Sequence, residues 1–406
     1  MKILYILPFV PWPVRVRSYN LIPRLTRKHE IHLLCVSSMK PNREQKAYLQ
    51  NYCKQVVHVA HGRAQAVFQC ATALPTKTPL RMAYYKSGAA RSMVGQLIED
   101  VNADVIYVER WRALQYLPEE TTTPVLCDPT DSMTLYNSRL MHQGSWWERF
   151  IGWIEHSRFF DYEPMLARRA DVSVFCSSVD MECVKKRAAE ARFALVPNGV
   201  DCEKFYFKRD GEEQANTLVF TGNLKYRPNW HALTFFLREI FPLVRAEMPE
   251  TRFLVVGNGA SQHVTASGGD QREGKVKAID FVADLRPYIA SAVVSVAPLT
   301  VGAGVSNKLL EGFATGTAVV ATPLACSGLP AKSGEHLLIA NNARQFAAQV
   351  IALLKDHKLR SRLALNARRL VEEKYDWEIV AAGMEQLLLE VAQRRMPTYD
   401  PVNSVA

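Results

Sequence analysis

The sequence has little cysteine and no long hydrophobic run. Its eight cysteines are scattered among 406 residues without a C-x-x-C pair, which argues against a disulfide framework or a zinc site and favours reduced thiols in the cytosol. No apolar run reaches the roughly 18 residues that a membrane-spanning helix needs. The opening MKILYILPFVPWP is too short and too rich in proline for a cleavable signal peptide, and is typical of a first core strand.

Several motifs that carry particular chemistry are also missing. No G-x-G-x-x-G follows the first strand, and there is no P-loop or G-x-S-x-G elbow, which argues against a dinucleotide-dependent oxidoreductase, a P-loop NTPase and an α/β hydrolase. There is no D-x-D pair, and the ten histidines show no ligand spacing, so we expect no metal site. No zinc-finger, RNP or helix-turn-helix pattern supports a nucleic-acid partner.

Acidic residues are scarce in the first quarter of the chain. Residues 1–98 hold 15 Lys and Arg against Glu30 and Glu44, a net charge of +13, whereas the whole chain carries +10. No acid occurs between Gln45 and Ile98, where aromatic residues such as Phe68 alternate with basic ones. Basic charge mixed with aromatics suits an anionic partner such as a membrane surface or a lipid phosphate, and a solvated basic face is the alternative.

What is present is the composition and pattern of a large α/β protein. Hydrophobic residues make up 48% of the chain and charged residues 22%, which excludes a disordered, collagen-like or coiled-coil chain. Strand-length apolar runs alternate with helix-length amphipathic stretches in both halves, and this predicts parallel sheets built from β-α-β units. The turn-rich and polar segment 197–216 is the best candidate for a domain boundary.

The segment 297–322 carries the most informative pattern. A loop with two glycines follows a predicted strand, and a helix begins around Ser306, so its first N–H groups would face an anion. Lys308 would add a positive charge, and Glu311, about one turn later, could accept hydrogen bonds from ribose hydroxyls. These features together describe a nucleoside-diphosphate site. The alternative is an ordinary β-α-β crossover with a solvated Lys–Glu pair.

A second group of polar residues lies at 220–229, again after a strand and before a helix. Its Lys225 and Arg227 could neutralise a leaving diphosphate, and the alternative is a helix-entry turn with solvated basic residues.

A third group lies at 125–132 in the first half. Asp128 and Asp131 come just past a strand, where a base or an acceptor-binding group would sit. Alternatively, Asp131 caps the following helix and Asp128 holds the turn.

At these residues the chain resembles the retaining glycosyltransferases of family four, which have the GT-B fold. Within that family it is most similar to the sugar transferases associated with bacterial exosortase and exopolysaccharide loci. The similarity spans nearly the whole length, and Phe220–Asn229 and Val305–Glu311 carry most of its specificity. It implies a metal-independent enzyme without a cofactor, which takes a nucleotide-sugar as its donor substrate and retains the anomeric configuration.

The resemblance also implies an organisation. We expect the α/β GT-B fold, with two doubly wound Rossmann-like domains facing each other across a cleft. Residues 1–200 would form the acceptor-side domain, residues 201–376 the nucleotide-sugar domain, residues 377–394 a helix packing back on the N-terminal domain, and residues 395–406 a flexible tail.

Residue roles follow from the same resemblance. Glu311 matches the ribose-binding glutamate of the family, Lys308 and the loop Gly302–Ser306 would meet the diphosphate, and the loop near Val282 would hold the base through its backbone. Asp131 falls near a first-domain polar residue close to the sugar. The predicted catalytic residues are Asp131, Lys225, Lys308 and Glu311. The predicted donor-binding residues are Gly222, Asn223, Arg227, Val282, Ala283, Leu285, Gly302, Gly304, Val305, Ser306 and Asn307. The predicted acceptor-side residues are Arg15, Arg17 and Asp128, and no metal ligand is predicted.

Three positions depart from the family pattern. Ala303 stands where the family often has an earlier glutamate, and Asn223 stands where it usually has an arginine. The first loop, Pro11–Arg15, lacks the usual glycines. These departures motivate the alternative of a degenerate, non-catalytic binding or scaffold subunit.

An aromatic stretch between Trp146 and Phe160 has two readings. The favoured expectation is a crossover helix packed in the core, and the alternative is an interfacial helix that grips a lipid-linked acceptor. With the basic first quarter, this makes peripheral attachment to the anionic inner face of the plasma membrane a hypothesis.

The sequence thus predicts a cytoplasmic glycosyltransferase of bacterial surface polysaccharide synthesis. Its partners would be a nucleotide-sugar, a glycan or lipid-linked acceptor and an anionic membrane surface, and not nucleic acid. The enzymatic alternative is another GT-B reaction, such as sugar-nucleotide epimerisation.

Overall fold

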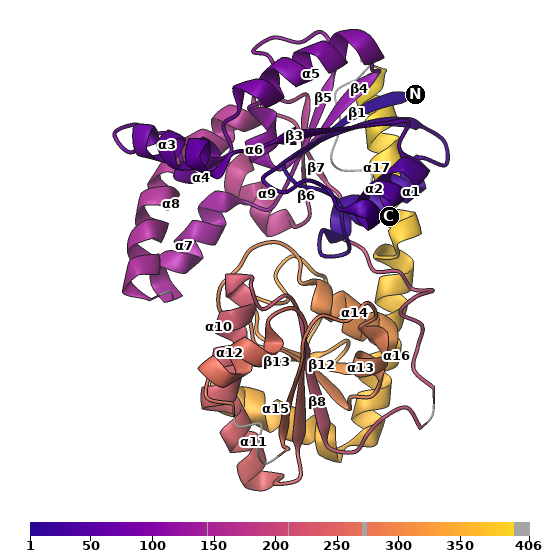
Figure 1. The fold of residues 1–406 in the computed structure, drawn as a ribbon. Coiled ribbons are helices and arrows are strands. Elements are labelled where there is room, and N and C mark those ends of the chain that lie inside the picture. The colour runs from indigo at the N-terminus through magenta and orange to yellow at the C-terminus, as the bar shows by residue number, and fades with distance from the viewer. Residues whose placement is uncertain (144, 210, 270–273, 394–406) are drawn as a thin grey trace. The chain divides into compact units, whose positions relative to one another are not determined.

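The computed structural model describes residues 1–143, 145–209, 211–269 and 274–393 (Figure 1). The chain divides into two compact units. The first unit comprises Met1–Asn137, Trp153–Val196 and the chain from Ala381, and the second comprises Ser138–Gly152 and Pro197–Val380. The predicted tail at 395–406 lies outside the described residues. In this division the chain passes from the first unit to the second after Val196 and returns after Val380. The predicted domain limits at 200 and 376 stay predictions.

The first unit is built on a seven-stranded parallel sheet in the order β3-β2-β1-β4-β5-β6-β7. Its strands are β1 (Lys2–Leu7), β2 (Glu30–Ser37), β3 (Gln55–Ala60), β4 (Val105–Glu109), β5 (Val125–Thr130), β6 (Val172–Phe175) and β7 (Phe193–Leu195). Its helices are α1 (Val16–Leu25), α2 (Arg43–Tyr52), α3 (Arg63–Ala73), α4 (Leu80–Tyr84), α5 (Gly88–Val101), α6 (Trp111–Leu114) and α9 (Ser178–Lys185). Helices α7 (Met133–Gln143), α8 (Trp146–Ala167) and α17 (Trp377–Ala392) belong to it in part.

The second unit is built on a six-stranded parallel sheet in the order β10-β9-β8-β11-β12-β13. Its strands are β8 (Thr217–Thr221), β9 (Arg252–Val256), β10 (Val276–Ile279), β11 (Val294–Ala297), β12 (Ala318–Ala321) and β13 (Leu338–Ile339). Its helices are α10 (Arg227–Phe235), a π-helical turn (Phe236–Ile240), α11 (Phe241–Glu247), α12 (Ala260–Ala266), α13 (Arg286–Ala290), α14 (Asn307–Thr315), α15 (Ala343–Lys355) and α16 (His357–Lys374).

Both sheets have the doubly wound arrangement that the sequence predicts. In each unit the strand order reverses once, between β1 and β4 and between β8 and β11. Nearly continuous apolar runs such as KILYIL form strands that are buried on both faces, because helices cover each side of a parallel sheet. The reversal points matter for function, since ligands of such sheets bind beyond the carboxyl ends of the strands there.

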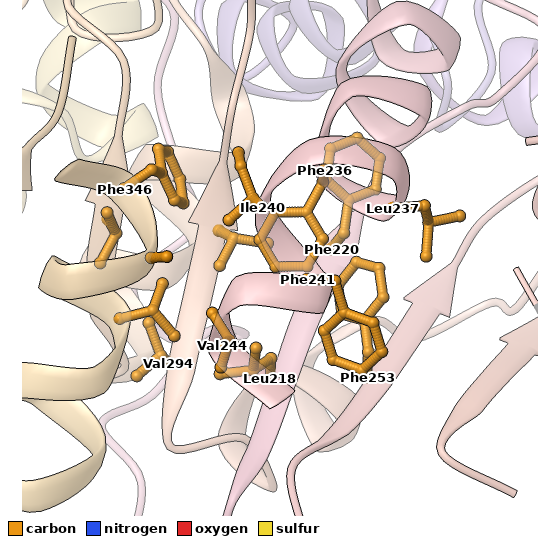
Figure 2. Packing of buried hydrophobic residues seen from close by; sticks show 14 of the residues in the cluster. Leu218, Phe220, Phe236, Leu237, Ile240, Phe241, Val244, Phe253, Val294 and Phe346 are labelled. Atoms are coloured by element: carbon orange, nitrogen blue, oxygen red, sulfur yellow. The ribbon is translucent and has the colours of Figure 1, made fainter. Parts of the chain in front are cut away.

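Phenylalanine packing holds the second sheet to its helices. Figure 2 shows Phe220 and Phe253 of the sheet together with Phe236 and Phe241, and the ring centroids of Phe236 and Phe253 are 4.5 Å apart. Each of these rings is almost fully buried, and burying one contributes roughly 1.5–3 kcal/mol. The core therefore fixes β8, the strand that leads into the predicted donor loop.

The C-terminal helix α17 contacts the first unit. The Glu385 carboxylate accepts hydrogen bonds from Lys28 Nζ and His29 Nε2, both at 3.1 Å. The chain thus starts and ends its described part in the same unit.

The expectation that the aromatic stretch packs in the core is wrong for most of its length. The side chains of Trp146, Trp147 and Trp153 are 67%, 56% and 61% exposed, and Phe150, Ile151 and Phe160 are exposed as well. Only Phe159 of this group is fully buried. A helix that carries apolar residues all around cannot bury every face when it packs on one side only.

Candidate functional site

The structure brings the strongest predicted residues together at the strand reversal of the second unit. Strands β8 and β11 are paired there. The loop after β8 carries Gly222 and Asn223, and the loop after β11 leads into α14 with Lys308 and Glu311. Both loops leave the carboxyl edge of the sheet, which is where a ligand of this architecture binds.

Lys308 lies in the first turn of α14, with 8% of its side chain exposed. Its Nζ donates a hydrogen bond to Asn229 Oδ1 at 2.7 Å and stands 4.9 Å from the centre of the Phe220 ring. Burial lowers the pKa of Lys308 to about 8, and the nearby Glu311 carboxylate opposes that shift. An anionic ligand would favour the charged ammonium, so the lysine is placed to gain from binding one.

Glu311 lies one turn further along the same helix. Its carboxylate accepts a 3.5 Å hydrogen bond from Thr221 Oγ1 at the end of β8. Burial raises the pKa of Glu311 to about 7, while Lys308 and the Thr221 hydroxyl lower it. Hydroxyl donors from a ligand would favour the ionised form, as the predicted contact with a ribose requires.

Asn229 connects the two loops and is absent from the predicted set. Its side chain accepts from Lys308 and donates through Nδ2 to the Asn223 carbonyl at 3.0 Å. A Cβ on Gly222 would stand 2.8 Å from that Nδ2, and a Cβ on Gly257 would stand 2.0 Å from the Gly222 carbonyl oxygen. Close packing of β8 and β9 ends therefore requires glycine at both positions. The only sign of Asn229 in the sequence is a side-chain amide in a helix that follows a strand. Such amides are common outside binding sites.

The basic residues of the β8 loop are arranged unequally. Lys225 is exposed, and its backbone N–H donates to Asn223 Oδ1 at 3.1 Å. Arg227 Nε forms an ion pair with Glu148 Oε1 at 2.7 Å, and His231 Nε2 contacts the same oxygen at 3.2 Å. Arg227 therefore already has a carboxylate partner, whereas the Lys225 side chain extends toward solvent.

Glu148 comes from the segment Ser138–Gly152 of the second unit, which sequence reasoning did not connect with this site. Burial alone would raise its pKa, but hydrogen bonds from the Ser145 hydroxyl and backbone, together with His231, lower the pKa to about 2. The same segment supplies Arg139, whose Nη1 donates to the Gly302 carbonyl at 2.5 Å.

The remaining predicted donor residues surround this edge. Val282 and Leu285, which follow β10, are half-buried against Val219 and its neighbours, and Ala283 is exposed. Gly302, Gly304 and the buried Val305 form the loop before α14, and Ser306 is the residue before the helix. The Asn307 side chain accepts from Asn198 Nδ2 at 3.3 Å. The structure therefore places these residues near the carboxyl edge of the second sheet. Their contacts with a donor stay predictions.

In the first unit, the acceptor-side residues lie at the carboxyl edge of the sheet, at two depths. Asp128 is fully buried and accepts from Arg17 Nε at 2.5 Å and from the Tyr107 hydroxyl at 2.7 Å. Arg17 is 3% exposed. Both lie beneath the edge, so they position β5 and α1 and have almost no surface for direct contact with an acceptor. Arg15, in contrast, is exposed.

Asp131 is partly accessible and pairs with Arg110, whose Nη1 is 3.2 Å from Asp131 Oδ2. Burial raises the pKa of Asp131 to about 6, and Arg110 opposes that shift. The first turn of α7 is capped by a different carboxylate: Glu163 accepts from the N–H groups of Met133 at 2.6 Å and Thr134 at 3.1 Å. Asp131 therefore does not serve as that cap.

Two absences concern the described part of the chain. Within it, no group of three or more His, Cys, Asp or Glu side chains is placed to hold a metal ion. No described helix combines the length and apolarity needed to cross a membrane.

Comparison with known proteins gives a family match and distant relatives. Residues 215–356 match the family model described as Glycosyl transferases group 1. An uncharacterised 44.6 kDa protein in the cps region of Klebsiella pneumoniae is 23% identical over 86% of this chain and 88% of its own. The phosphatidyl-myo-inositol mannosyltransferase of Mycolicibacterium smegmatis is 29% identical over 54% of this chain and 56% of its own.

Solved structures show the fold. Sucrose-phosphate synthase from Thermosynechococcus elongatus superposes with a TM-score of 0.73 over 97% of this chain and 100% of its own, at 14% identity. HepE from Anabaena, solved in complex with UDP-glucose, gives a TM-score of 0.66 over 96% and 100%, at 15% identity. With two doubly wound parallel sheets, these likenesses confirm the predicted GT-B fold. The facing of the two domains across a cleft and the closeness to exosortase-associated transferases stay predictions.

Proposed function

We propose that this protein is a glycosyltransferase that moves a sugar from a nucleoside-diphosphate-sugar to a glycan or lipid-linked acceptor in the synthesis of a bacterial surface polysaccharide or glycolipid. The observation that carries the proposal is the placement of the buried Lys308 and the half-buried Glu311 together on α14 at the strand reversal of the second unit. The family match covers these two residues. The relatives named for a capsule region and for mannosyl transfer, and the UDP-glucose complex of a structural neighbour, support the substrate class.

The proposed chemistry needs positive charge where the diphosphate leaves. Lys308 and the N-terminal N–H groups of α14 would stabilise the negative charge that develops on the leaving diphosphate. Lys225, exposed on the neighbouring loop, would add a second cation. Because protein cations supply this charge, we propose that the reaction needs neither a metal ion nor a cofactor.

The remaining roles concern orientation. Glu311 would accept hydrogen bonds from the ribose hydroxyls and fix the nucleotide on α14. The acceptor hydroxyl would attack the anomeric carbon from the face on which the diphosphate leaves, which retains the configuration. The bond between the sugar and the diphosphate would break, and the hydroxyl proton would pass to the departing diphosphate. Asp131, with a pKa near 6, would lie on the acceptor side as a polar partner of the sugar or the attacking hydroxyl.

We further propose that the protein works at an anionic membrane surface. The α3–α8 surface, which we define as Val67, Phe68, Leu74, Trp153 and Phe160, exposes large apolar side chains on two helices of the first unit. Helices α3 and α8 lie near each other in Figure 1. They are joined through the Arg158 guanidinium, which donates to the carbonyls of Leu74 and Thr78 at 2.8 and 3.0 Å.

The charges around the α3–α8 surface indicate which partner binds there. Arg63 and Lys77, at the two ends of the α3 segment, are exposed, and no acid lies between residues 45 and 98. Apolar side chains next to basic ones match the interface of an anionic bilayer.

A thermal-shift experiment tests the donor site. UDP, GDP, ADP and their sugar conjugates are each added to the full chain, with and without EDTA. A ligand at 100 times its dissociation constant stabilises by about 2.7 kcal/mol, which corresponds to about 5 °C or more for a unit of this size.

We expect one nucleotide series to raise the melting temperature regardless of EDTA, and Lys308→Ala to abolish the shift. Lys332→Ala is the matched control, because Lys332 is an exposed lysine of the same unit. If no nucleotide shifts the protein, the proposal is overturned in favour of a non-catalytic binding subunit. A shift that EDTA abolishes would contradict metal independence.

A further inference from the structure

Four arginines gather at the strand reversal of the first unit. Arg15 lies between β1 and α1, and Arg110 directly follows β4. Strands β1 and β4 are hydrogen-bonded neighbours, with Ile6 opposite Val108, so both arginines leave the same edge of the sheet. Arg112 follows on α6, and α4, which carries Arg81, packs beside α6 through hydrogen bonds such as that from Gln115 Nε2 to the Met82 carbonyl, at 3.2 Å. We call Arg15, Arg81, Arg110 and Arg112 the arginine cluster.

Aromatic rings hold three of these guanidinium groups. The Arg112 guanidinium lies 4.4 Å from the centre of the Tyr85 ring, and that of Arg15 lies 4.6 Å from the centre of the Phe9 ring. The Arg81 guanidinium lies 5.5 Å from the Tyr136 ring. Such stacking orients a guanidinium while its N–H groups at the edge stay available to an acceptor. The Arg112 Nε is buried and has no hydrogen-bond partner among the described residues.

The cluster carries more positive charge than its surroundings neutralise. Arg110 pairs with Asp131 at 3.2 Å. For Arg15, Arg81 and Arg112, no carboxylate of the described residues comes within ion-pair distance of the side chain. The nearby Glu109 is buried, accepts a 2.7 Å hydrogen bond from the Tyr5 hydroxyl, and has its pKa raised by burial.

The arginines of the cluster also repel one another electrostatically. Burial, together with repulsion from Arg110, Arg15 and Arg81, lowers the pKa of Arg112 to about 10 against the opposing effect of Tyr85. Like charges that repel one another in this way are unfavourable unless an anion joins them.

The backbone at this edge is strained. Arg110, which follows β4, and Thr130, which ends the neighbouring β5, have φ of +74° and +73° although neither is glycine. The Arg110 N–H donates to the Asp128 carbonyl at 2.7 Å, which fixes this conformation. Strain of this kind gathers at ligand sites, where the surrounding structure holds a side chain in place.

We propose that the arginine cluster binds a phosphate or diphosphate group, and that the acceptor of this protein is a phosphate-bearing molecule. Planar guanidinium groups bind phosphate oxygens in a bidentate manner, and several arginines at one edge of the sheet suit a doubly charged group. The phosphate site rests on the geometry of the first unit alone. Its assignment to the acceptor rests on the proposed function.

Titration calorimetry of the full chain with inorganic pyrophosphate tests the site. Pyrophosphate can occupy two places, the donor site at Lys308 and the arginine cluster. We expect Arg112→Gln and Arg15→Gln to weaken one binding event by about tenfold or more, and Lys308→Ala to remove the other. Arg91→Gln is the matched control, because it removes one charge from an exposed arginine of the same unit that pairs with Glu119.

The outcomes separate this inference from the proposed function. Pyrophosphate binding that both cluster variants leave unchanged overturns the cluster as a site, even if nucleotides bind. Binding that depends on Arg112 and Arg15 supports it, even if no nucleotide shifts the melting temperature. Arg15 is exposed, so its variant remains informative if Arg112→Gln does not fold.

Two further arms distinguish the source of the phosphate. Phosphatidylcholine vesicles containing farnesyl diphosphate should sediment the protein if the phosphate is carried by a lipid, and glucose 1-phosphate should compete with pyrophosphate if it is carried by a soluble sugar. Either result supports a phosphate-bearing acceptor when the cluster variants abolish it and Arg91→Gln does not. Failure of both arms overturns the assignment to the acceptor.

Discussion

Replacing Glu311 by glutamine should stabilise the protein at alkaline pH while it weakens donor binding. Burial raises the pKa of this carboxyl to about 7. A carboxyl with a raised folded-state pKa favours folding while it is protonated, and this contribution is lost as the pH rises from the unfolded value near 4.3 through 7. The wild-type protein should therefore lose more stability across that window than the variant does.

The size of the effect follows from the shift. A difference of one pKa unit corresponds to about 1.4 kcal/mol, so the carboxylate destabilises the second unit by roughly 3 kcal/mol at pH 8 relative to its protonated form. Between pH 5 and pH 8 the wild-type free energy of unfolding should fall by about 2 kcal/mol relative to that of Glu311→Gln. The variant also removes the negative charge beside the buried Lys308 ammonium, which destabilises the variant. We therefore expect about 2 kcal/mol and not more.

Donor binding should change in the opposite direction. A carboxylate that accepts ribose hydroxyls contributes hydrogen bonds worth about 1.5–3 kcal/mol each, so the variant should bind its nucleotide roughly 10- to 100-fold more weakly. A residue that lowers the stability of the protein and raises its affinity for a ligand has a role in binding that ligand.

The assay is urea unfolding at pH 5 and pH 8, followed by nucleotide titration. Glu182→Gln is the control, because this exposed glutamate faces Lys185 on the surface and should change neither measurement. If Glu311→Gln lowers stability equally at both pH values and leaves nucleotide affinity unchanged, Glu311 is a structural ion-pair partner, and the assignment of the donor site fails.

Three further predictions concern the glycines, the membrane and the Glu148 ion pair. Gly257→Ala should destabilise the second unit by several kcal/mol in urea unfolding, since its Cβ would stand 2.0 Å from a carbonyl oxygen; unchanged stability would contradict the geometry. Trp153→Ala combined with Phe68→Ala should weaken sedimentation with phosphatidylglycerol vesicles by about tenfold or more, whereas Val179→Ala, also exposed, should not. Arg227→Gln should leave nucleotide affinity within about threefold if Glu148 is the true partner of that arginine, and a loss of tenfold or more would place Arg227 at the diphosphate.

The sequence predicts the alternation of strands and helices well because buried parallel strands are almost continuously apolar. It misses β3, whose sequence QVVHVA lies at the sheet edge with no fully buried residue, so its hydrophobic signal is weak. Apolar residues also occur just outside strands, as with Phe281, which is 58% exposed beyond the end of β10. Local pattern thus identifies central strands and fails where tertiary packing decides burial.

The candidate site divides in the same way. Lys308 and Glu311 are found from sequence because a glycine loop, a helix start and their spacing all lie within one segment. Asn229 and Glu148 are missed because their roles depend on partners 79 and 83 positions away, Lys308 and His231. The sequence places Asp128 just past a strand, where it would be accessible. In the structure it lies within β5 and is buried, paired with Arg17, 111 positions away.

The two proposed anion sites differ in one physical respect that salt can reveal. Lys308 is almost fully buried, so added salt screens its interaction with a diphosphate weakly. Arg15 and Arg81 are exposed, and ions at physiological strength screen such charges beyond about 8 Å. Raising the salt from 50 to 500 mM should therefore weaken the pyrophosphate binding that depends on Arg15 much more than the binding that depends on Lys308. Equal salt sensitivity of the two events would mean that both report one site, and the assignment of separate donor and acceptor charges to the two sheets would fail.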